Sequence, residues 1–451
     1  MSNRFPEVVH LGAEHGVTGS AHFVRANGMN ILVDCGMPQQ GESALSIPEW
    51  PVRPSEIDYL FITHAHIDHT GRIPELVRNG FEGEILCTHP TKALLVPMLK
   101  DAMQLDDMDE GAIARLTRAI DDLAWGFEYA QEFELKNGIR FKLGEAGHIL
   151  GSCFVSLRSD APRWAITFSG DLGSNDNPLL PEPDPPDPCD LLVLESTYGD
   201  RAHEGKDQRL ETFGRILSRS LEDGGKAFIP SFALGRTQVL LHELKFLATD
   251  PGLKASFPLL SVESGIPIFL DSPLSLEITE IYEKLVPFWD EAAKRRLRKN
   301  GSTPFDLENL YAAGRYGEHA RLLEMKGPAL IIAGSGMCTG GRIVDHLKGG
   351  LGEPRNDIVF VGYQAEGTPG RRILEHGGRP DAFVQLDGGK IPIRAGVHAV
   401  SGYSAHADRE GLIAWVRSMG DRPGRIKLVH GEPAAQKSLS ERLGALGYTV
   451  G

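Results

Sequence analysis

The nine residues Thr63–Gly71 constrain this chain most, because they place three histidines and one aspartate within six consecutive positions. The preceding residues 57–62 are rich in β-branched and aromatic side chains and predict a strand. Residues 71–77 carry Pro74 in what reads as the first turn of a helix. The polar side chains therefore lie on a loop at the end of a strand. Imidazole and carboxylate groups are zinc ligands, and a catalytic zinc uses three of them and leaves one position for water, so the loop predicts a metal site.

The spacing His-x-His-x-Asp-His, formed by His64, His66, Asp68 and His69, resembles the signature of the metallo-β-lactamase superfamily. The resemblance implies an α/β fold, an αβ/βα sandwich, with a site for two metal ions. It also implies that Asp34, at the end of the apolar residues of the strand predicted at 30–36, supports the metal loop from behind.

Two further polar residues follow predicted strands. Residues 139–143 lead to His148, and residues 165–169 lead to Asp171. With the first cluster they supply what a two-metal site requires: we expect His64, His66 and His148 to hold one ion, Asp68 and His69 the second, and Asp171 to bridge. Two ions about 3.5–4 Å apart can clamp an in-line displacement at phosphorus.

Composition narrows the class of protein. The chain has 451 residues, of which 41% are hydrophobic and 24% charged, which suits a globular protein of two to three domains. No run of eighteen apolar residues is present, so we expect no membrane association. The five cysteines form no C-x-x-C pair and indicate a reduced, cytoplasmic protein. The net charge of −14 argues weakly against non-specific binding to nucleic acid.

The pattern of predicted strands and helices changes after about residue 200. Short apolar runs at 226–230, 266–271 and 329–333 alternate with helical patterns at 208–221, 237–247, 275–281 and 288–298. Short two-sided apolar strands that alternate with helices predict a parallel α/β sheet, hence a second domain. From about residue 390 the first pattern returns, with a strand predicted at 391–397.

Three motifs in the second half narrow the resemblance. Leu194–Arg201 (Leu-Glu-Ser-Thr-Tyr-Gly-Asp-Arg), Ser404–Asp408 (Ser-Ala-His-Ala-Asp) and Val429–Glu432 (Val-His-Gly-Glu) look like motifs A, B and C of the β-CASP branch. Within that branch the chain resembles bacterial and archaeal relatives of the nuclease subunit of the mRNA cleavage-and-polyadenylation complex. The resemblance implies a β-CASP cap domain at 201–380, inserted between the two parts of the metallo-β-lactamase domain at 1–200 and 381–451.

The resemblance also implies roles for the motif residues. His430 completes the second metal site of a centre with two Zn²⁺ ions. A metal-bridging hydroxide, held with the help of Asp68 and Asp171, attacks phosphorus. His406 acts as general acid, oriented by Glu195, and the products carry 3′-hydroxyl and 5′-phosphate ends. A histidine suits this task because its unperturbed pKa is about 6.5.

The implied substrate is single-stranded RNA, because a histidine at motif C accompanies RNA substrates in this branch. Endonucleolytic and 5′-to-3′ exonucleolytic modes stay open, as does a homodimer. The alternatives are a DNA nuclease of the same branch or a small-molecule hydrolase on the same fold. Candidate phosphate contacts lie on loops before helices, where backbone N–H groups meet phosphate: Ser231, Arg236, Ser335 and Gly336. The basic run 294–299 reads more simply as a solvated helix face.

Overall fold

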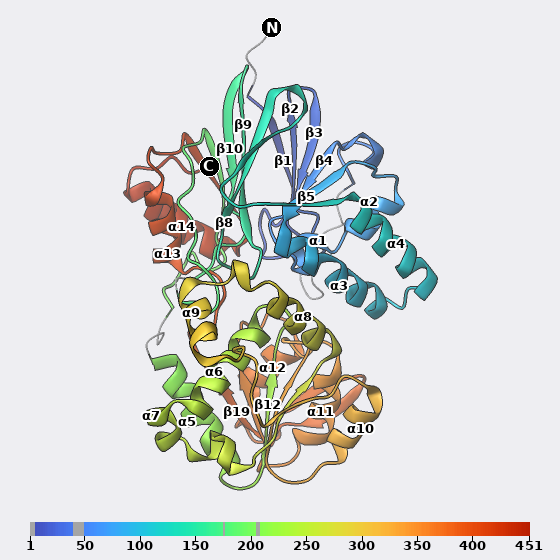
Figure 1. The fold of residues 1–451 in the computed structure, drawn as a ribbon, viewed down its shortest axis with the longest axis vertical. Coiled ribbons are helices and arrows are strands. Elements are labelled where there is room, and N and C mark those ends of the chain that lie inside the picture. Colours follow the sequence, from blue (N-terminus) through green and yellow to red (C-terminus); the bar gives the residue numbers. More distant parts are fainter. Residues whose placement is uncertain (1–4, 39–48, 175, 204–207) are drawn as a thin grey trace. The chain divides into compact units, whose positions relative to one another are not determined.

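The computed structural model describes residues 5–38, 49–174, 176–203 and 208–451. The chain forms two compact units (Figure 1). Unit 1 comprises residues 1–202 and 405–451, and unit 2 comprises residues 203–404. In the structure the second segment of unit 1 begins at residue 405. The sequence placed the beginning of this segment at residue 381. The reason is that the strand at Gly396–Ala399 pairs with the sheet of unit 2.

Unit 1 contains two six-stranded sheets. The first has the order β1-β2-β3-β4-β5-β6 and consists of β1 (Glu7–Gly12), β2 (Ala21–Ala26), β3 (Met29–Val33), β4 (Tyr59–Phe61), β5 (Glu84–Thr88) and β6 (Ala124–Phe127). The second has the order β20-β11-β10-β9-β8-β7 and consists of β7 (Glu132–Glu134), β8 (Ile139–Glu145), β9 (Cys153–Asp160), β10 (Arg163–Phe168), β11 (Leu191–Glu195) and β20 (Arg425–Val429).

Helices cover the outer face of each sheet, which gives the predicted αβ/βα sandwich (Figure 1). The helices of unit 1 are α1 (Ile67–Thr70), α2 (Ile73–Arg78), α3 (His89–Leu105), α4 (Glu110–Leu123), α13 (Arg409–Ser418) and α14 (Pro433–Ala445). Apolar residues of α2, α3 and α4 pack on the first sheet, and those of α13 and α14 pack on the second.

The strand sequences explain the sandwich. In β3, Ile31 and Val33 face the core between the sheets, while Leu32 faces the helices. In β11, Val193 faces the same inner core and Leu194 faces α13 and α14. Successive side chains point to opposite faces, so a strand covered on both sides must be apolar at nearly every position.

Unit 2 has one six-stranded sheet in the order β14-β13-β15-β12-β16-β19, and every pairing in it is parallel, as the sequence predicted. Its strands are β12 (Lys226–Pro230), β13 (Ile268–Asp271), β14 (Leu310–Ala312), β15 (Ala329–Ala333), β16 (Asp357–Phe360) and β19 (Gly396–Ala399). Strands β17 (Phe383–Leu386) and β18 (Gly389–Pro392) form a separate two-stranded sheet. The strand predicted at 391–397 is wrong as one element, because residues 393–395 separate β18 from β19.

The helices of unit 2 are α5 (Arg209–Leu221), α6 (Arg236–Thr249), α7 (Pro251–Ser256), α8 (Pro273–Lys284), α9 (Glu291–Asn300), α10 (Tyr316–Glu324), α11 (Arg342–Gly350) and α12 (Pro369–His376). A separate apolar core centred on β12, β15 and β16 holds this unit together. Among the described residues, no helix combines the length and the apolarity that crossing a membrane requires.

Candidate metal centre

The histidine loop follows β4 and folds at once into α1. His66 is the N-cap of that helix, and His64 Nε2 lies 3.1 Å from His66 Nδ1. Backbone bonds tie the loop to the neighbouring segment: Ser20 N donates to Asp68 O, and Cys35 N donates to His69 O, both at 2.8 Å. The loop is therefore fixed by β2 and β3 as well as by its own strand.

The first group of side chains comes from the ends of three strands. His148, after β8, places Nε2 3.3 Å from His66 Nδ1. Asp171, after β10, places Oδ2 3.6 Å from the Nε2 atoms of both His64 and His148. His64, His66 and His148 can together hold a metal ion, and Asp171 borders that group.

A second group lies on the other side of Asp171. His69 Nε2 is 3.2 Å from His430 Nε2, and His430 Nε2 is 3.6 Å from Asp68 Oδ2. Asp171 Oδ1 lies 3.4 Å from His69 Nε2. The two oxygens of Asp171 thus face different groups. The structure brings together all seven predicted ligands, although residue 430 is 366 positions from residue 64.

Burial sets the charge state of the first group. Desolvation lowers the pKa of His64, His66 and His148, so these imidazoles are neutral at pH 7. Neutral imidazole is the form that binds a metal. For Asp68, burial opposes ionisation, but the neighbouring His430 and His69 outweigh it and lower the pKa to about 2. Asp171 is likewise held ionised, because His430 and His69 lower its pKa against the effect of burial.

Polar residues behind the cluster fix the orientation of its members. Asp34 Oδ2 lies 2.7 Å from His69 Nδ1, and Asp34 Oδ1 accepts a hydrogen bond from Thr63 N at 2.8 Å. Thr197 Oγ1 lies 3.1 Å from His430 Nδ1. Sequence reasoning singled out Asp34 but missed Thr63 and Thr197. In the sequence, Thr63 is marked only by its position before the predicted ligand His64, and Thr197 only by its position near Glu195.

His406 and Glu195 lie beside the two groups. Glu195, the last residue of β11, places Oε1 3.3 Å from His406 Nδ1 and accepts a hydrogen bond from Leu172 N at 2.7 Å. Burial works to lower the pKa of His406, but the carboxylates of Glu195 and Asp171 outweigh it and raise the pKa to about 9. His406 is therefore protonated at neutral pH.

The spacing of the side chains fits bound metal. Ligand atoms about 2.0–2.1 Å from a tetrahedral ion lie about 3.3 Å from one another. Six neighbouring pairs of nitrogen and oxygen atoms in the two groups are 3.1–3.6 Å apart. Asp171 Oδ1 is buried and has no hydrogen-bond partner among the described residues. This oxygen faces His69 Nε2 and His430 Nδ1, each at 3.4 Å, so it lies among nitrogen atoms that could bind the same cation.

The four candidate phosphate contacts belong to unit 2, and their role stays a prediction. Ser231 Oγ lies 3.0 Å from Thr237 Oγ1 at the start of α6. Ser335 Oγ accepts a hydrogen bond from Thr339 N at 3.0 Å, and Gly336 O accepts one from Gln364 Nε2 at 2.9 Å. The guanidinium of Arg236 lies 5.8 Å from the ring centre of Tyr403.

A second cluster of histidines and an aspartate is present in unit 2, and sequence reasoning missed it. Asp271 ends β13, and its Oδ2 lies 2.6 Å from His319 Nδ1 and 2.6 Å from His346 Nε2. Arg342 Nη1 donates to Asp271 Oδ1 at 2.7 Å. The three donors come from α10 and α11, so this carboxylate joins two helices to the end of a strand.

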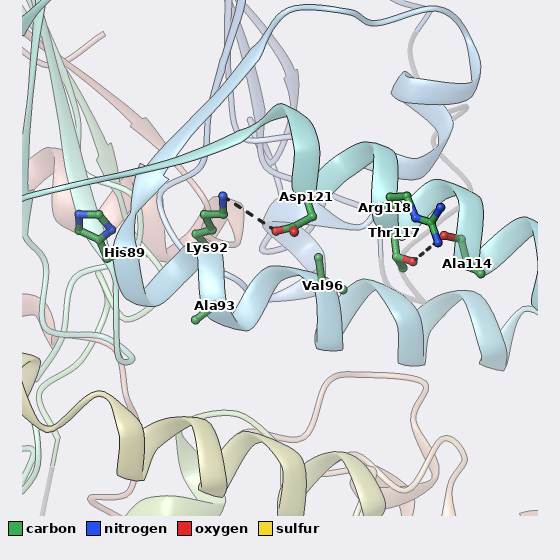
Figure 2. Close-up of a pocket in the computed structure, with 8 residues that line it drawn as sticks. All are labelled: His89, Lys92, Ala93, Val96, Ala114, Thr117, Arg118 and Asp121. Carbon is green, nitrogen blue, oxygen red and sulfur yellow. Dashed lines mark hydrogen bonds and ion pairs between the residues drawn. The ribbon is translucent and has the colours of Figure 1, made fainter.

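A groove lies elsewhere in unit 1. It has a volume of about 580 Å³ and runs between α3 and α4 (Figure 2). Its charges are mixed: Lys92 Nζ lies 4.0 Å from Asp121 Oδ1, and Arg118 lies further along the rim. None of the predicted ligands lines this groove.

Comparison with known families covers most of the chain. Residues 16–207 match the metallo-beta-lactamase superfamily, residues 237–373 match the Beta-Casp domain, and residues 390–450 match the Zn-dependent metallo-hydrolase RNA specificity domain. The first and third of these ranges contain all seven predicted ligands and both His406 and Glu195.

Individual relatives agree with the family matches. Ribonuclease TTHA0252 of Thermus thermophilus is 36% identical over 443 residues, which are 98% of this chain and 97% of that protein. Transcription termination factor FttA of Pyrococcus horikoshii is 32% identical over 96% of this chain and 67% of its own length. Cleavage and polyadenylation specificity factor 73 of Drosophila melanogaster is 29% identical over 94% of this chain and 60% of its own length.

Proposed function

Because the chain belongs to the metallo-β-lactamase superfamily, in its β-CASP branch, we propose that it is a zinc-dependent ribonuclease that hydrolyses single-stranded RNA. One observation carries the proposal: a histidine held protonated by Glu195 lies beside a buried cluster of five imidazoles and two ionised carboxylates. The cluster suits metal ions, and the protonated histidine suits a leaving group that departs as an anion.

We assign His64, His66 and His148 to one ion, and Asp68, His69 and His430 to the second, with Asp171 between them. When bound, two Zn²⁺ ions would lower the pKa of a water molecule and offset the charge that develops on the phosphoryl oxygens. Asp34 and Thr197 hold the imidazoles of His69 and His430 in the required orientation.

The proton for the leaving oxygen comes from His406. Glu195 accepts from Nδ1, so the proton that is transferred is the one on Nε2. The attacking water gives up a proton to solvent as its oxygen bonds to phosphorus, the bond from phosphorus to the 3′ oxygen breaks, and His406 protonates that oxygen. The products are a 3′-hydroxyl and a 5′-phosphate, and neutral His406 regains a proton from solvent.

Several observations favour RNA over the alternatives. The relative that is 36% identical over nearly its whole length is named a ribonuclease. His430, the motif C residue that accompanies RNA substrates in this branch, lies 3.6 Å from Asp68 in the second group. A DNA nuclease is the nearest rival. A small-molecule hydrolase would leave the Beta-Casp match at 237–373 without a role.

The test uses RNA in which sulfur replaces the leaving 3′ oxygen, because a thiolate departs without protonation. We expect His406→Ala to slow cleavage of ordinary RNA by about 10²–10⁴-fold, the usual contribution of a general acid, and to leave the metal content unchanged. On the sulfur-containing RNA the variant and the wild type should cleave at similar rates. The control, Arg53→Gln, replaces an exposed residue of unit 1 and should leave both rates unchanged.

Matched single-stranded DNA completes the experiment. Cleavage of DNA as fast as RNA would replace the proposal with a DNA nuclease. Cleavage of neither polymer by metal-loaded protein would overturn the proposal. An equal loss on both RNA substrates would contradict the acid role of His406 alone.

A further inference from the structure

Helix α9 concentrates positive charge on unit 2. Five of its ten residues are basic and only Glu291 is acidic, although the chain as a whole has a net charge of −14. The basic residues are Lys294, Arg295, Arg296, Arg298 and Lys299.

The basic side chains are arranged by the helical repeat. Residues three and four apart lie on the same face of a helix, so Arg295, Arg298 and Lys299 share one face, and all three are exposed. Ala293 and Leu297 lie on the opposite face, where Ala293 is buried. We call Arg295, Arg298 and Lys299 the α9 basic face.

Both ends of α9 are fixed, so the basic face has a defined position on unit 2. Asp290 caps the first turn and accepts a hydrogen bond from Ala292 N at 2.6 Å. Gly301 ends the helix in the left-handed conformation, with φ of 67°. Cations in a last turn stabilise a helix through its dipole, which accounts for Arg298 and Lys299 but not for Arg295.

Glu291 is four residues before Arg295 and shares its face, but it is one acid among five basic residues. Glu291 lies 2.5 Å from Lys294 and 3.9 Å from Arg298. In the described part of the chain, neither Arg295 nor Lys299 forms an ion pair. Helix α5 of the same unit differs: its exposed Arg215 pairs with Glu211 at 3.2 Å.

The positive charge extends beyond α9. Lys245 of α6 donates hydrogen bonds to Ser302 Oγ at 2.7 Å and to Thr303 O at 2.6 Å, directly after the end of α9. Burial, with Arg296 and Lys245, lowers the pKa of His242 to about 4. His242 therefore stays neutral at pH 7 in a positive environment.

We propose that the α9 basic face binds the sugar–phosphate backbone of the RNA substrate without reading its sequence. The inference rests on the proposed function and adds the surface that holds the polymer. An RNA strand releases counterions when cations replace them, and this release drives association in proportion to the number of phosphates contacted. The guanidinium of arginine also matches phosphate geometry. Since the chain carries an excess of acids, attraction of RNA requires a local surface of this kind.

The experiment compares two double variants in steady-state cleavage of single-stranded RNA at several salt concentrations. Arg295→Gln/Lys299→Gln neutralises the basic face. Arg215→Gln/Arg219→Gln is the control, because α5 offers two exposed arginines with the same four-residue spacing on the same unit. Backbone contacts act equally on substrate and transition state, so we expect a change in KM and not in kcat.

For the α9 variant, the slope of log(1/KM) against log salt should become shallower by about 1.4, which is about 0.7 for each lost contact with a single strand. This corresponds to a KM about tenfold higher at physiological salt. The control should match the wild type. An unchanged slope and KM in the α9 variant, or an equal change in both variants, would overturn the inference and leave the proposed function standing. Absence of RNA cleavage by the wild type would overturn both.

Discussion

The two histidine–aspartate clusters of this molecule contain the same residue types and differ in spacing and charge. In unit 1 neighbouring nitrogen and oxygen atoms of the predicted ligands lie 3.1–3.6 Å apart, and Asp171 Oδ1 has no hydrogen-bond partner among the described residues. In unit 2 both histidines lie 2.6 Å from one oxygen of Asp271, and Arg342 occupies the other oxygen.

The difference distinguishes a metal site from a hydrogen-bonded hub. Contacts of 2.6 Å are hydrogen bonds and are shorter than the separation of two ligands around one ion, and a guanidinium already supplies the positive charge that a carboxylate requires. We therefore assign metal binding to the first cluster and cohesion of unit 2 to the second. Residue type alone does not separate the two roles.

The largest effect should come from the centre of the first cluster. Asp171→Asn removes the charge that faces both groups, and we expect loss of bound metal and a fall of about 10³-fold or more in RNA cleavage, because bound metal contributes several kcal/mol. Metal content per chain and cleavage rate give the readout. The matched change in the second cluster, Asp271→Asn, should leave the metal content unchanged. If Asp171→Asn kept the same metal content as the wild type, the assignment of metal binding to the first cluster would be wrong.

Substitution of Asp271 in the second cluster should lower the stability of unit 2. Asp271→Asn leaves the guanidinium of Arg342 without its anion, and loss of one partner of a buried pair costs about 3–5 kcal/mol. Hydrogen exchange of peptides from β13, α10 and α11 measures the effect within unit 2. The control is Asp345→Asn, since Asp345 is 42% exposed and lies 3.4 Å from His319. Equal protection in wild type and Asp271→Asn would contradict the role of a hub.

Low pH should weaken the hydrogen bonds that Asp271 forms with His319, His346 and Arg342. Burial opposes ionisation of Asp271, but hydrogen bonds from His346, His319 and Arg342 outweigh it and lower the pKa to about 2. Because the folded pKa is below the unfolded value of about 3.9, the stabilisation is full above that value. It is lost as pH falls from about 4 to about 2, and amounts to about 2–3 kcal/mol. Unfolding of unit 2 followed across this range should show the loss in wild type, and Asp271→Asn should abolish it. The same pH slope in both proteins would refute the assignment to Asp271.

The smallest effect concerns a supporting residue of the first cluster. Thr197→Val removes the hydroxyl that lies 3.1 Å from His430 Nδ1. Loss of a hydrogen bond to a ligand weakens metal binding by about 10–100-fold, and we expect about tenfold for one of the two ions. Competition with a chelator measures the loss of affinity, with Thr117→Val of α4, a half-buried residue, as control. A uniform loss of both ions would show that Thr197 does more than orient His430.

The sequence predicted the first cluster because its residues mark the ends of apolar strands. Strands β4, β10, β11 and β20 run parallel to a neighbour and end at one edge of the sandwich, so the residues that follow them must meet. Strand ends are visible in a sequence as an apolar run that stops at a polar residue. For this reason Asp171 was predicted to lie near His64 although the two are far apart in the chain; His148 follows β8, which is antiparallel to both of its neighbours.

The second cluster could not be found in the same way. His319 and His346 lie within helices, where a histidine resembles any surface residue until the neighbouring strand is placed against it. The supporting residues Thr63 and Thr197 were missed because a threonine beside a ligand has no pattern of its own. The limit of unit 2 at residue 404 also depends on a long-range pairing, that of β19 with β16.

The most direct test of the account is a titration of metal-free protein with Zn²⁺ while RNA cleavage is followed, for the wild type and for Asp271→Asn. The account predicts that the rate reaches its plateau at two equivalents of Zn²⁺ per chain in both proteins. A plateau at one equivalent would contradict the two-ion assignment. A requirement for a third equivalent that Asp271→Asn removes would contradict the distinction between the two clusters.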